Sequence, residues 1–396
     1  MRIIIANKFY YNRGGDCICS IELQKLLQQN GHEVAFFSMN YPDNFSSEYA
    51  SYFAPSVDFS SPGFLPKLKA ASRLFSPTDV RIRFEKLIDD FHPDIIHLNN
   101  IHSYLSPVLA KIGRERNIKV VWTLHDYKLI CPTYSCLRDG HPCELCFHQK
   151  FPVLLNRCMK NSLPASVLAF LEAIYWNRRR VEKYVDTFIC PSCFMKEKMM
   201  QAGFDKKRMV VMNNFMPDDK VAPVKPVLSA NPNQFCYVGR LSEEKNIEAV
   251  LETVAELPYQ LVIIGDGPLR KSLEDKYQSD KIKFLGHRSY NEFQRIVQES
   301  AFTVIPSKWY ENNPMSVIES LCMGTPVLGA DMGGIPELLN DSNGRLFDVN
   351  DHLSLKSMIQ EMFHLSFNRE QIAADAQLRF GAKRYYEKMI SLYKER

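Results

Sequence analysis

The sequence predicts an α/β protein built from two doubly wound domains, each with a parallel sheet. Short apolar runs of strand length alternate along the chain with amphipathic segments of helical period, which is the pattern of parallel strands joined by helices. The alternation stops at a proline-rich stretch, residues 213–234, and restarts after it. Because 396 residues exceed what one hydrophobic core ordinarily serves, two successive domains are expected.

Apolar runs indicate the strands of each domain. In the first half they are "RIIIAN" (2–7), "EVAFFS" (33–38), "DIIHLN" (94–99), "KVVWTLH" (119–125) and "TFICPS" (187–192). In the second half they are "QFCYVGR" (234–240), "QLVIIGDG" (260–267), "IKFLG" (282–286), "FTVIPS" (302–307) and "TPVLGA" (325–330). Segments such as "CSIELQKLLQQNG" (19–31) supply the helices between them.

The domain boundaries follow from these patterns. Residues 1–210 are expected to form the N-terminal domain, with a cysteine-rich insertion at about 131–158, and residues 211–380 the C-terminal domain. The final segment, 381–396, has the apolar period of a helix, and it is expected to dock on the first domain.

Composition narrows the class of protein. The 49 basic and 45 acidic residues leave a net charge of +4, which does not by itself favour nucleic-acid binding. No apolar run is long enough for a membrane span or a signal-peptide core, so a cytoplasmic, reducing location is expected. Residues 150–208 are locally basic, with twelve Lys/Arg against five Asp/Glu. A solvated helix face is the ordinary interpretation, and contact of Arg178, Arg179 and Arg180 with an anionic membrane surface is the sharper one.

The stretch "YENNPMSVIES" (310–320) places two carboxylates, Glu311 and Glu319, eight positions apart. Asn313 and Pro314 are typical of an N-cap and first helical residue, which predicts a helix over about 314–323. The free amides at the start of such a helix favour an anion such as phosphate. The alternative is a capping box between Ser316 and Glu319, with Glu311 a solvated charge.

Two cations follow the first strand of the same domain. "VGRLSEEKN" places Arg240 and Lys245 in a loop at the carboxyl end of a parallel strand, where such sheets bind ligands. Together with a helix N-terminus they predict a diphosphate site, whereas an isolated pair of cations would ordinarily be solvated. "VIIGDGPLR" has Arg270 where a dinucleotide fingerprint requires its third glycine, so Gly265 and Gly267 indicate a tight turn rather than NAD binding.

These motifs together resemble family 4 of the retaining glycosyltransferases, which have the GT-B fold. The resemblance lies in "VGRLSEEKN", "IGDGPLR", "ENNPMSVIESLCMGTPVLGADMGGIPEL" and "GHEV", which span almost the whole length. It includes the E-x7-E signature at Glu311 and Glu319, a Gly-Gly at Gly14 and Gly15, and the loop 333–337. The implied enzyme moves a sugar from a nucleoside diphosphate, UDP or GDP, to a saccharide or lipid-linked acceptor, in cell-surface polysaccharide or lipopolysaccharide biosynthesis.

The resemblance also implies residue roles. Glu319 would hold the ribose hydroxyls, Glu311 would face the donor sugar, and Arg240 and Lys245 would neutralise the departing diphosphate. The implied donor-binding residues are Gly15, Gly239, Gly265, Asn313, Pro314, Met315, Ser316 and Glu319. No D-x-D sequence is present, and the expected catalysis needs no metal or other cofactor, because Arg and Lys side chains supply the positive charge.

Two polar sites lie at the ends of predicted strands of the first domain. The resemblance places His125 of "WTLHDYK" next to the reacting carbon of the donor sugar, whereas a lone histidine at a strand end is ordinarily structural. It places His97, Asn99 and Asn100 on the acceptor side. Because no carboxylate is placed as a nucleophile, transfer is expected to proceed on one face through an oxocarbenium-like state, with a departing phosphate oxygen taking the acceptor proton.

The insertion raises a separate question. Cys131, Cys143, Cys146 and Cys158 have the spacing C-x11-C-x2-C-x11-C, and two interpretations stay open, a structural zinc site or ordinary buried thiols. The "CPSC" at 190–193 ends a strand, which argues against a redox role.

Rival functions remain at this stage. One is a sugar-nucleotide epimerase or a phosphorylase on the same twin-domain architecture, and the other is a zinc-containing binding scaffold.

Overall fold

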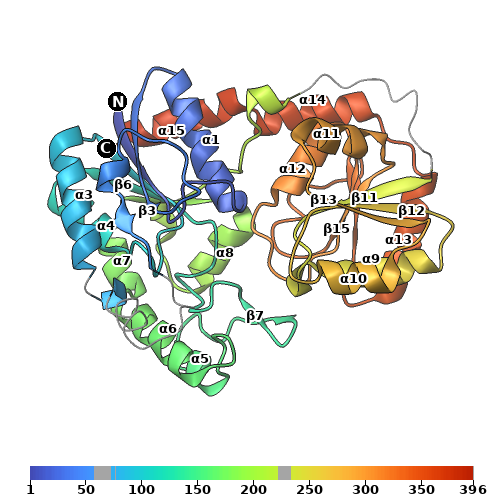
Figure 1. Ribbon diagram of the computed structural model, residues 1–396, viewed down its shortest axis with the longest axis horizontal. Helices are drawn as coiled ribbons and strands as arrows, with labels where there is room; N and C mark the ends of the chain where they lie inside the picture. The colour runs from blue at the N-terminus through green and yellow to red at the C-terminus, as the bar shows by residue number, and fades with distance from the viewer. Residues whose placement is uncertain (58–72, 76, 222–232, 396) are drawn as a thin grey trace. The chain divides into compact units, whose positions relative to one another are not determined.

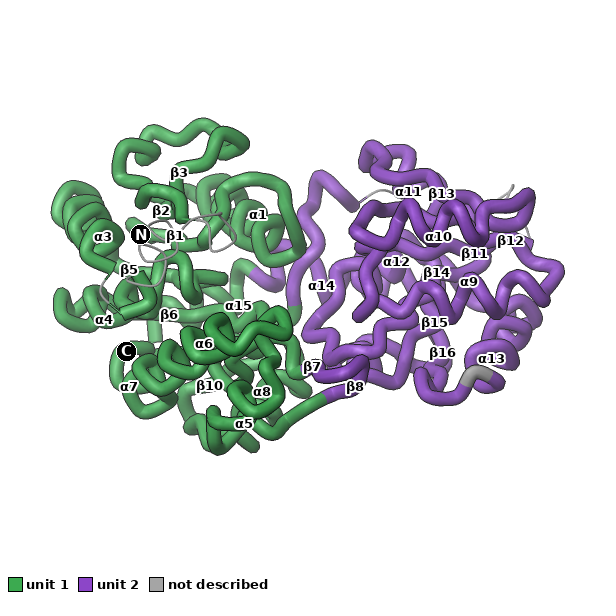
Figure 2. Tube along the Cα trace, turned by 60° about the horizontal axis from the view of Figure 1, so that its bottom comes forward, with its two compact units in different colours: residues 1–136, 143–213, 386–396 green, residues 137–142, 214–385 purple. Residues whose placement is uncertain are grey.

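The computed structural model describes residues 1–57, 73–75, 77–221 and 233–395 (Figure 1). The chain divides into two compact units (Figure 2). The first unit comprises residues 1–136, 143–213 and 386–396, and the second comprises residues 137–142 and 214–385. Part of the predicted linker, residues 222–232, lies outside the described residues. Within those residues, no helix is both long and apolar enough to cross a membrane.

The first unit is built on a six-stranded parallel sheet with the order β10-β9-β6-β5-β1-β2. The strands are β1 (Arg2–Ala6), β2 (Glu33–Phe37), β5 (Ile95–Leu98), β6 (Lys119–Thr123), β9 (Thr187–Cys190) and β10 (Met209–Val211). In chain order this is the doubly wound arrangement 2-1-3-4-5-6, whose topological switch lies between β1 and β5. Most side chains of its four inner strands are buried, because helices cover both faces of such a sheet.

The helices of the first unit alternate with these strands. They are α1 (Gly15–Gln29), α3 (Thr78–Phe91), α4 (Val108–Glu115), α5 (Pro152–Leu155), α6 (Leu163–Tyr175), α7 (Arg178–Tyr184) and α8 (Cys193–Gln201). Two short strands, β3 (Met39–Asn40) and β4 (Ala54–Pro55), pair with each other in parallel. Short 3₁₀ helices cover Ala50–Tyr52 and Lys206–Arg208.

The second unit has a six-stranded parallel sheet with the order β13-β12-β11-β14-β15-β16. The strands are β11 (Gln234–Val238), β12 (Gln260–Ile264), β13 (Ile282–Gly286), β14 (Thr303–Ile305), β15 (Val327–Ala330) and β16 (Gly344–Phe347). In chain order this is 3-2-1-4-5-6, the Rossmann order, with its switch between β11 and β14. The two sheets confirm the predicted GT-B fold class.

Helices also alternate with the strands of the second unit. They are α9 (Ile247–Ala255), α10 (Arg270–Tyr277), α11 (Tyr290–Glu299), α12 (Met315–Cys322), α13 (His352–His364) and α14 (Arg369–Phe380). The 3₁₀ helices here are Asp218–Lys220 and Glu243–Lys245. A two-stranded hairpin, β7 (Leu137–Arg138) and β8 (His141–Pro142), also belongs to this unit, although its sequence lies in the predicted insertion.

Helix α15 (Ala382–Lys394) ends the chain, and its residues from Tyr386 onward belong to the first unit. Met389, Leu392 and Tyr393 are buried. The Tyr393 hydroxyl lies 2.5 Å from Nδ1 of His97, a fully buried histidine of β5 whose Nε2 is 2.8 Å from Thr123 Oγ1. Burial lowers the pKa of His97 to about 3, so the ring is neutral at pH 7.

Tyr393→Phe is expected to destabilise the fold. The substitution leaves a buried imidazole nitrogen without its partner, which typically costs about 1–3 kcal/mol. Urea unfolding measures the loss. Tyr386→Phe is the matched control, because its hydroxyl contacts the more exposed His32 at 2.8 Å and its removal is expected to cost less. Equal effects of the two substitutions would contradict this account of α15.

Candidate functional site

An ion pair between a buried carboxylate and a partly exposed lysine lies at the topological switch of the second unit. Lys245 Nζ is 2.5 Å from Glu311 Oε1, and the Ser307 hydroxyl donates to the same oxygen at 2.6 Å. Lys245 is in the loop after β11, while Ser307 and Glu311 are in the loop after β14. The lysine also lies 5.1 Å from the centre of the Trp309 ring. The sequence-predicted Lys245 and Glu311 are therefore in direct contact.

Charge and hydrogen bonding keep Glu311 ionised. Its side chain is buried, and burial alone would raise the pKa of this carboxyl. The Lys245 ammonium and the hydrogen bonds from Lys245 and Ser307 outweigh burial, so the pKa of Glu311 lies below its ordinary value. The site thus holds a fixed carboxylate against a fixed ammonium.

The loop that follows β15 holds the backbone of Glu311. Gly334 N donates to Glu311 O at 2.7 Å. Gly333 has φ +64°, and a Cβ on it would lie 2.3 Å from the same carbonyl oxygen. Only glycine fits so close to another backbone in this conformation. The Gly-Gly of "GGIPE" therefore positions the glutamate.

Glycines in the loops after β11 and β12 also allow close packing. Gly265 has φ +136°, and a Cβ on it would lie 1.9 Å from Gly239 O. A Cβ on Gly239 would lie 2.8 Å from the Tyr237 hydroxyl, which donates to Arg240 O at 2.9 Å. The predicted donor-binding residues Gly239 and Gly265 thus allow the loops after β11 and β12 to approach each other.

The start of α12 differs from the prediction. The helix begins at Met315 and ends at Cys322, and Asn313 is not its N-cap. Instead, Asn313 Oδ1 accepts from Asn214 N at 2.7 Å, and Asn313 O accepts from Asn214 Nδ2 at 2.9 Å. Ser316 lies inside the helix, so the capping-box alternative is also wrong. The Nδ2 of Asn313 is buried and has no hydrogen-bond partner among the described residues.

The start of α12 has donors that the helix leaves without acceptors, and Arg240 lies in the separate loop after β11. The first amides of a helix, here those of Met315 and Ser316, have no acceptor within the helix, and Pro314 before them has no N–H. The Arg240 side chain is exposed, and no described carboxylate forms an ion pair with it. This is the arrangement of an anion site.

Glu319 occupies the middle of α12, and its side chain is partly exposed. Burial raises the pKa of Glu319 to about 7, while the Lys220 charge acts in the opposite direction. Burial and, after it, the charge of Glu319 raise the pKa of Tyr290, whose hydroxyl donates to Lys220 O at 2.8 Å. Glu319 is therefore a carboxyl close to half protonation at neutral pH, suited to exchange hydrogen bonds with hydroxyl groups.

In the first unit, polar residues meet at the switch between β1 and β5. His125 Nε2 lies 2.9 Å from Asn99 Oδ1, and Asn100 Nδ2 donates to Asp16 Oδ2 at 2.7 Å. Lys8 Nζ is 3.9 Å from the same Asp16 oxygen. Burial lowers the pKa of His125, although the charges of Asp16 and Asp126 oppose it. The predicted His125, Asn99 and Asn100 therefore form one cluster.

Three further residues of this region are Asn99, Asp16 and Gly15. Asn99 is 2% exposed, and its Nδ2 has no hydrogen-bond partner among the described residues. Asp16 was not predicted from the sequence, although an acid directly after Gly14 and Gly15 at a helix start was an available signal. Gly15 itself is exposed, and no neighbouring atom lies within 4 Å of a Cβ placed on it.

His97 corrects an acceptor-side prediction. Its side chain is fully buried, and both ring nitrogens have partners inside the first unit, Tyr393 and Thr123. The histidine lies within β5, whereas Asn99 and Asn100 lie beyond its end. His97 is therefore a core residue that positions α15.

Zinc was one of two open interpretations of the four cysteines, and the described residues contain no cluster of three or more ligating side chains. All eleven cysteines are free thiols. Cys131 Sγ instead lies 3.2 Å from Thr133 Oγ1, and Cys143 N donates to Cys136 O at 2.7 Å. The predicted set of Cys131, Cys143, Cys146 and Cys158 left out Cys136, whose thiol hydrogen-bonds Cys131.

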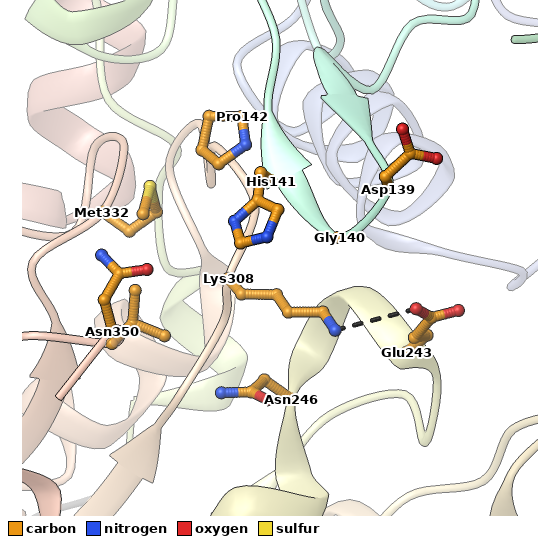
Figure 3. Close-up of a pocket in the computed structure, with 10 residues that line it drawn as sticks. Asp139, Gly140, His141, Pro142, Glu243, Asn246, Lys308, Met332 and Asn350 are labelled. Atoms are coloured by element: carbon orange, nitrogen blue, oxygen red, sulfur yellow. Dashed lines mark ion pairs between the residues drawn. The ribbon is translucent and has the colours of Figure 1, made fainter. Parts of the chain in front are cut away.

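A pocket of about 340 Å³ lies within the second unit (Figure 3). Lys308, which follows Ser307, and Asn246, which follows Lys245, line it together with Gly140 and His141 of the β7–β8 hairpin. Lys308 forms an ion pair with Glu243 at 3.7 Å (Figure 3). The volume is near the lower end of the ~300–1,000 Å³ typical of ligand pockets.

Two families of known proteins match the chain. The family described as "Glycosyltransferase Family 4" matches residues 18–220, and "Glycosyl transferases group 1" matches residues 219–379. A 42.6 kDa protein in the cps region of Klebsiella pneumoniae is 26% identical over 355 residues, covering 85% of this chain and 87% of that protein. A Mycobacterium tuberculosis GDP-mannose-dependent alpha-(1-6)-phosphatidylinositol dimannoside mannosyltransferase is 29% identical over 187 residues, covering 44% of this chain and 49% of that protein.

Solved structures share the fold. Sucrose-phosphate synthase from Thermosynechococcus elongatus superposes with a TM-score of 0.72 at 18% identity, over 99% of this chain and 98% of that one. Anabaena HepE in complex with UDP superposes with a TM-score of 0.67 at 16% identity, over 99% of both chains.

Glu319→Gln is expected to change how stability depends on pH. A carboxyl whose pKa rises from 4.5 to about 7 on folding binds more protons in the folded state between these values. The wild-type free energy of unfolding should therefore fall as pH rises from about 4.5 to 7, by about 1–3 kcal/mol from this group.

Urea unfolding at pH 5 and pH 8 checks this. Glutamine does not ionise, so the variant should gain stability relative to the wild type at pH 8 and not at pH 5. Glu243→Gln is the control, because its side chain is 80% exposed in the same unit, and it should leave the difference between the two pH values unchanged. A pH-independent offset in Glu319→Gln would contradict the raised pKa.

Proposed function

Because the chain belongs to glycosyltransferase family 4 and is a glycosyltransferase of GT-B fold, we propose that it transfers a sugar from a nucleoside diphosphate to a saccharide or lipid-linked acceptor with retention of configuration. The observation that carries the proposal is the Lys245–Glu311 ion pair, at 2.5 Å, beside unpaired donors at the start of α12. A pyrophosphate and a sugar hydroxyl are the groups that such a site matches.

The cations act on the leaving group. Negative charge grows on the diphosphate as the bond to the sugar breaks, and fixed positive charge stabilises that state more than the ground state. Lys245 is held by the ion pair, while Arg240 is exposed and has no ion-pair partner among the described carboxylates. Amides at Met315 and Ser316 add donors. Catalysis in this proposal needs no divalent metal.

The reaction proceeds on one face of the sugar. The bond between the anomeric carbon and the phosphate oxygen breaks, and a bond from the acceptor oxygen to the same carbon forms. The acceptor proton passes to the departing phosphate oxygen. Glu311 accepts a hydrogen bond from the donor sugar, and its lowered pKa keeps it ionised for this role. Glu319 binds the ribose hydroxyls.

The first unit supplies a neutral imidazole. Burial lowers the pKa of His125, and Asn99 Oδ1 fixes one ring nitrogen at 2.9 Å. This ring contacts the donor sugar in the proposal. Asn99 and Asn100 take the acceptor side, supported by the buried, unpaired Nδ2 of Asn99.

The comparisons support UDP or GDP as the donor nucleotide. HepE was solved with UDP, and the mycobacterial relative is named as GDP-mannose-dependent. The relative from a cps region supports a place in cell-surface polysaccharide or lipopolysaccharide synthesis. The proposal puts the enzyme in the cytoplasm at the inner membrane face, with peripheral contact through residues 150–208.

Glu311→Ala is expected to lower turnover by at least about 10² to 10³. The substitution removes the carboxylate at the sugar and leaves Lys245 without its partner. The measurement is sugar transfer from UDP- and GDP-sugars to a panel of saccharide acceptors. Asp341→Ala is the control, because its side chain is 99% exposed in the same unit and pairs with Arg345 at 3.1 Å.

Near-wild-type transfer by Glu311→Ala would refute the role of Glu311. Product formation without an acceptor would favour an epimerase, and dependence on inorganic phosphate would favour a phosphorylase. Thermal stabilisation by nucleotide is measured in parallel, since a ligand at 100 times its Kd adds about 2.7 kcal/mol to a folded protein.

A further inference from the structure

Helix α6 turns its apolar face outward. Leu163, Val167, Leu171 and Ile174 are 37–48% exposed, and their spacing of four, four and three residues places them on one stripe. The opposite face, with Ser166, Ala169 and Glu172, is buried. A surface helix of a water-soluble protein ordinarily has the reverse arrangement.

A buried ion pair fixes this orientation. Glu172 is 5% exposed, and Lys128 Nζ lies 2.9 Å from its Oε2. The Ser103 hydroxyl donates to both carboxylate oxygens at 2.8 and 2.9 Å. Rotating the helix to bury its leucines would expose this pair or leave one charge buried without its partner, which is strongly unfavourable. The outward stripe is therefore a property of the folded unit.

The stripe extends onto α5, which lies beside α6 (Figure 1). Leu155 of α5 is 70% exposed, and Phe151 before it is 53% exposed. Fourteen large apolar side chains are exposed in the described part of the chain, and seven of them lie between residues 151 and 175. The exposed apolar side chains of α5 and α6 are called the apolar patch below. Such a concentration marks an interaction surface.

Basic residues flank the apolar patch in the sequence, and their exposed members are called the basic rim below. Between residues 151 and 183 the chain carries six Lys/Arg and two Asp/Glu, one of which is the buried Glu172. Arg157 and Lys160 precede α6, and Arg179 follows it, all exposed. Arg180 packs over the Tyr175 ring at 4.2 Å. The patch thus has a positively charged rim.

Arg178 is not counted in the basic rim, because its guanidinium group already has partners within the protein. One of its guanidinium nitrogens hydrogen-bonds Gly203 O, and it forms an ion pair with Glu182 at 3.7 Å. The sequence predicted membrane contact through the three consecutive arginines, whereas the structure indicates contact through the apolar side chains that precede them.

The positive charge of the basic rim favours one of two possible occupants of the apolar patch, a second copy of this chain or an anionic membrane. A second copy of this chain on a two-fold axis would bring the same basic rim against itself, and like charges would oppose the contact. Anionic lipid headgroups would attract the rim, while the patch enters the boundary of the acyl chains. Contact with an anionic bilayer therefore gives the apolar side chains an apolar environment and the basic side chains anionic partners.

We propose that α6 lies in the interface of an anionic bilayer, with the apolar patch at the acyl boundary and the basic rim on the headgroups. This deepens the peripheral membrane contact of the proposed function and rests on that part of it. It does not depend on the transfer reaction, because binding needs neither donor nor acceptor.

Vesicle flotation of the full chain tests the proposal. One set of vesicles contains phosphatidylcholine and phosphatidylglycerol in equal parts, and the other contains phosphatidylcholine alone. The wild type is expected to float with the anionic vesicles, and less so at high salt. Leu171→Gln combined with Ile174→Gln should lower the partition coefficient about tenfold or more.

The matched control is Leu353→Gln combined with Leu378→Gln. These leucines are 74% and 72% exposed on α13 and α14 of the second unit, and their replacement should leave flotation unchanged. Thermal unfolding checks that both double variants are folded, and nucleotide stabilisation separates loss of membrane contact from loss of the proposed function.

Three results would overturn the proposal. They are equal flotation of the α6 double variant and the wild type, absence of the wild type from both kinds of vesicle, and a wild-type dimer in light scattering that the α6 double variant abolishes. The last result would assign the patch to a second copy of the chain.

Discussion

The contact between Lys245 and Glu311 joins two loops that leave neighbouring strands of one sheet but are 66 residues apart in sequence. An unpaired carboxylate buried in this place would be costly, and the ammonium with Ser307 makes it stable. The Gly333–Gly334 turn holds the same loop from the other side. The proposed chemistry depends on this arrangement, because it presents a fixed charge pair where the strand order of the second unit switches.

The remaining features of the site follow from how parallel sheets end. Loops after β11 and β14 in the second unit, and after β1 and β5 in the first, leave their sheets at switch points, where no neighbouring connection covers them. Two buried amide donors that have no hydrogen-bond partner among the described residues, Asn313 Nδ2 and Asn99 Nδ2, lie in these loops.

Local sequence patterns predicted the fold well. The wrong predictions concern residues whose hydrogen-bond partners lie far away in the sequence. Every predicted apolar run contains a strand. The edge strands β10 and β16 were missed, because β10 is only three residues long and β16 contains Gly344 and Arg345. Asn313 looked like a helix cap, but its partner is Asn214, 99 residues away. His97 looked like a site residue, but its partner is Tyr393, 296 residues away. The outward face of α6 likewise depends on Lys128, which no helical period reveals.

Calorimetric titration with UDP, UMP and uridine, and with the guanine series, measures the central claim that the second unit binds a diphosphate at Lys245. For the preferred base, Lys245→Ala should weaken diphosphate binding about tenfold or more and leave nucleoside binding nearly unchanged. Equal weakening of the nucleoside and the diphosphate, or no weakening of either, would contradict the account.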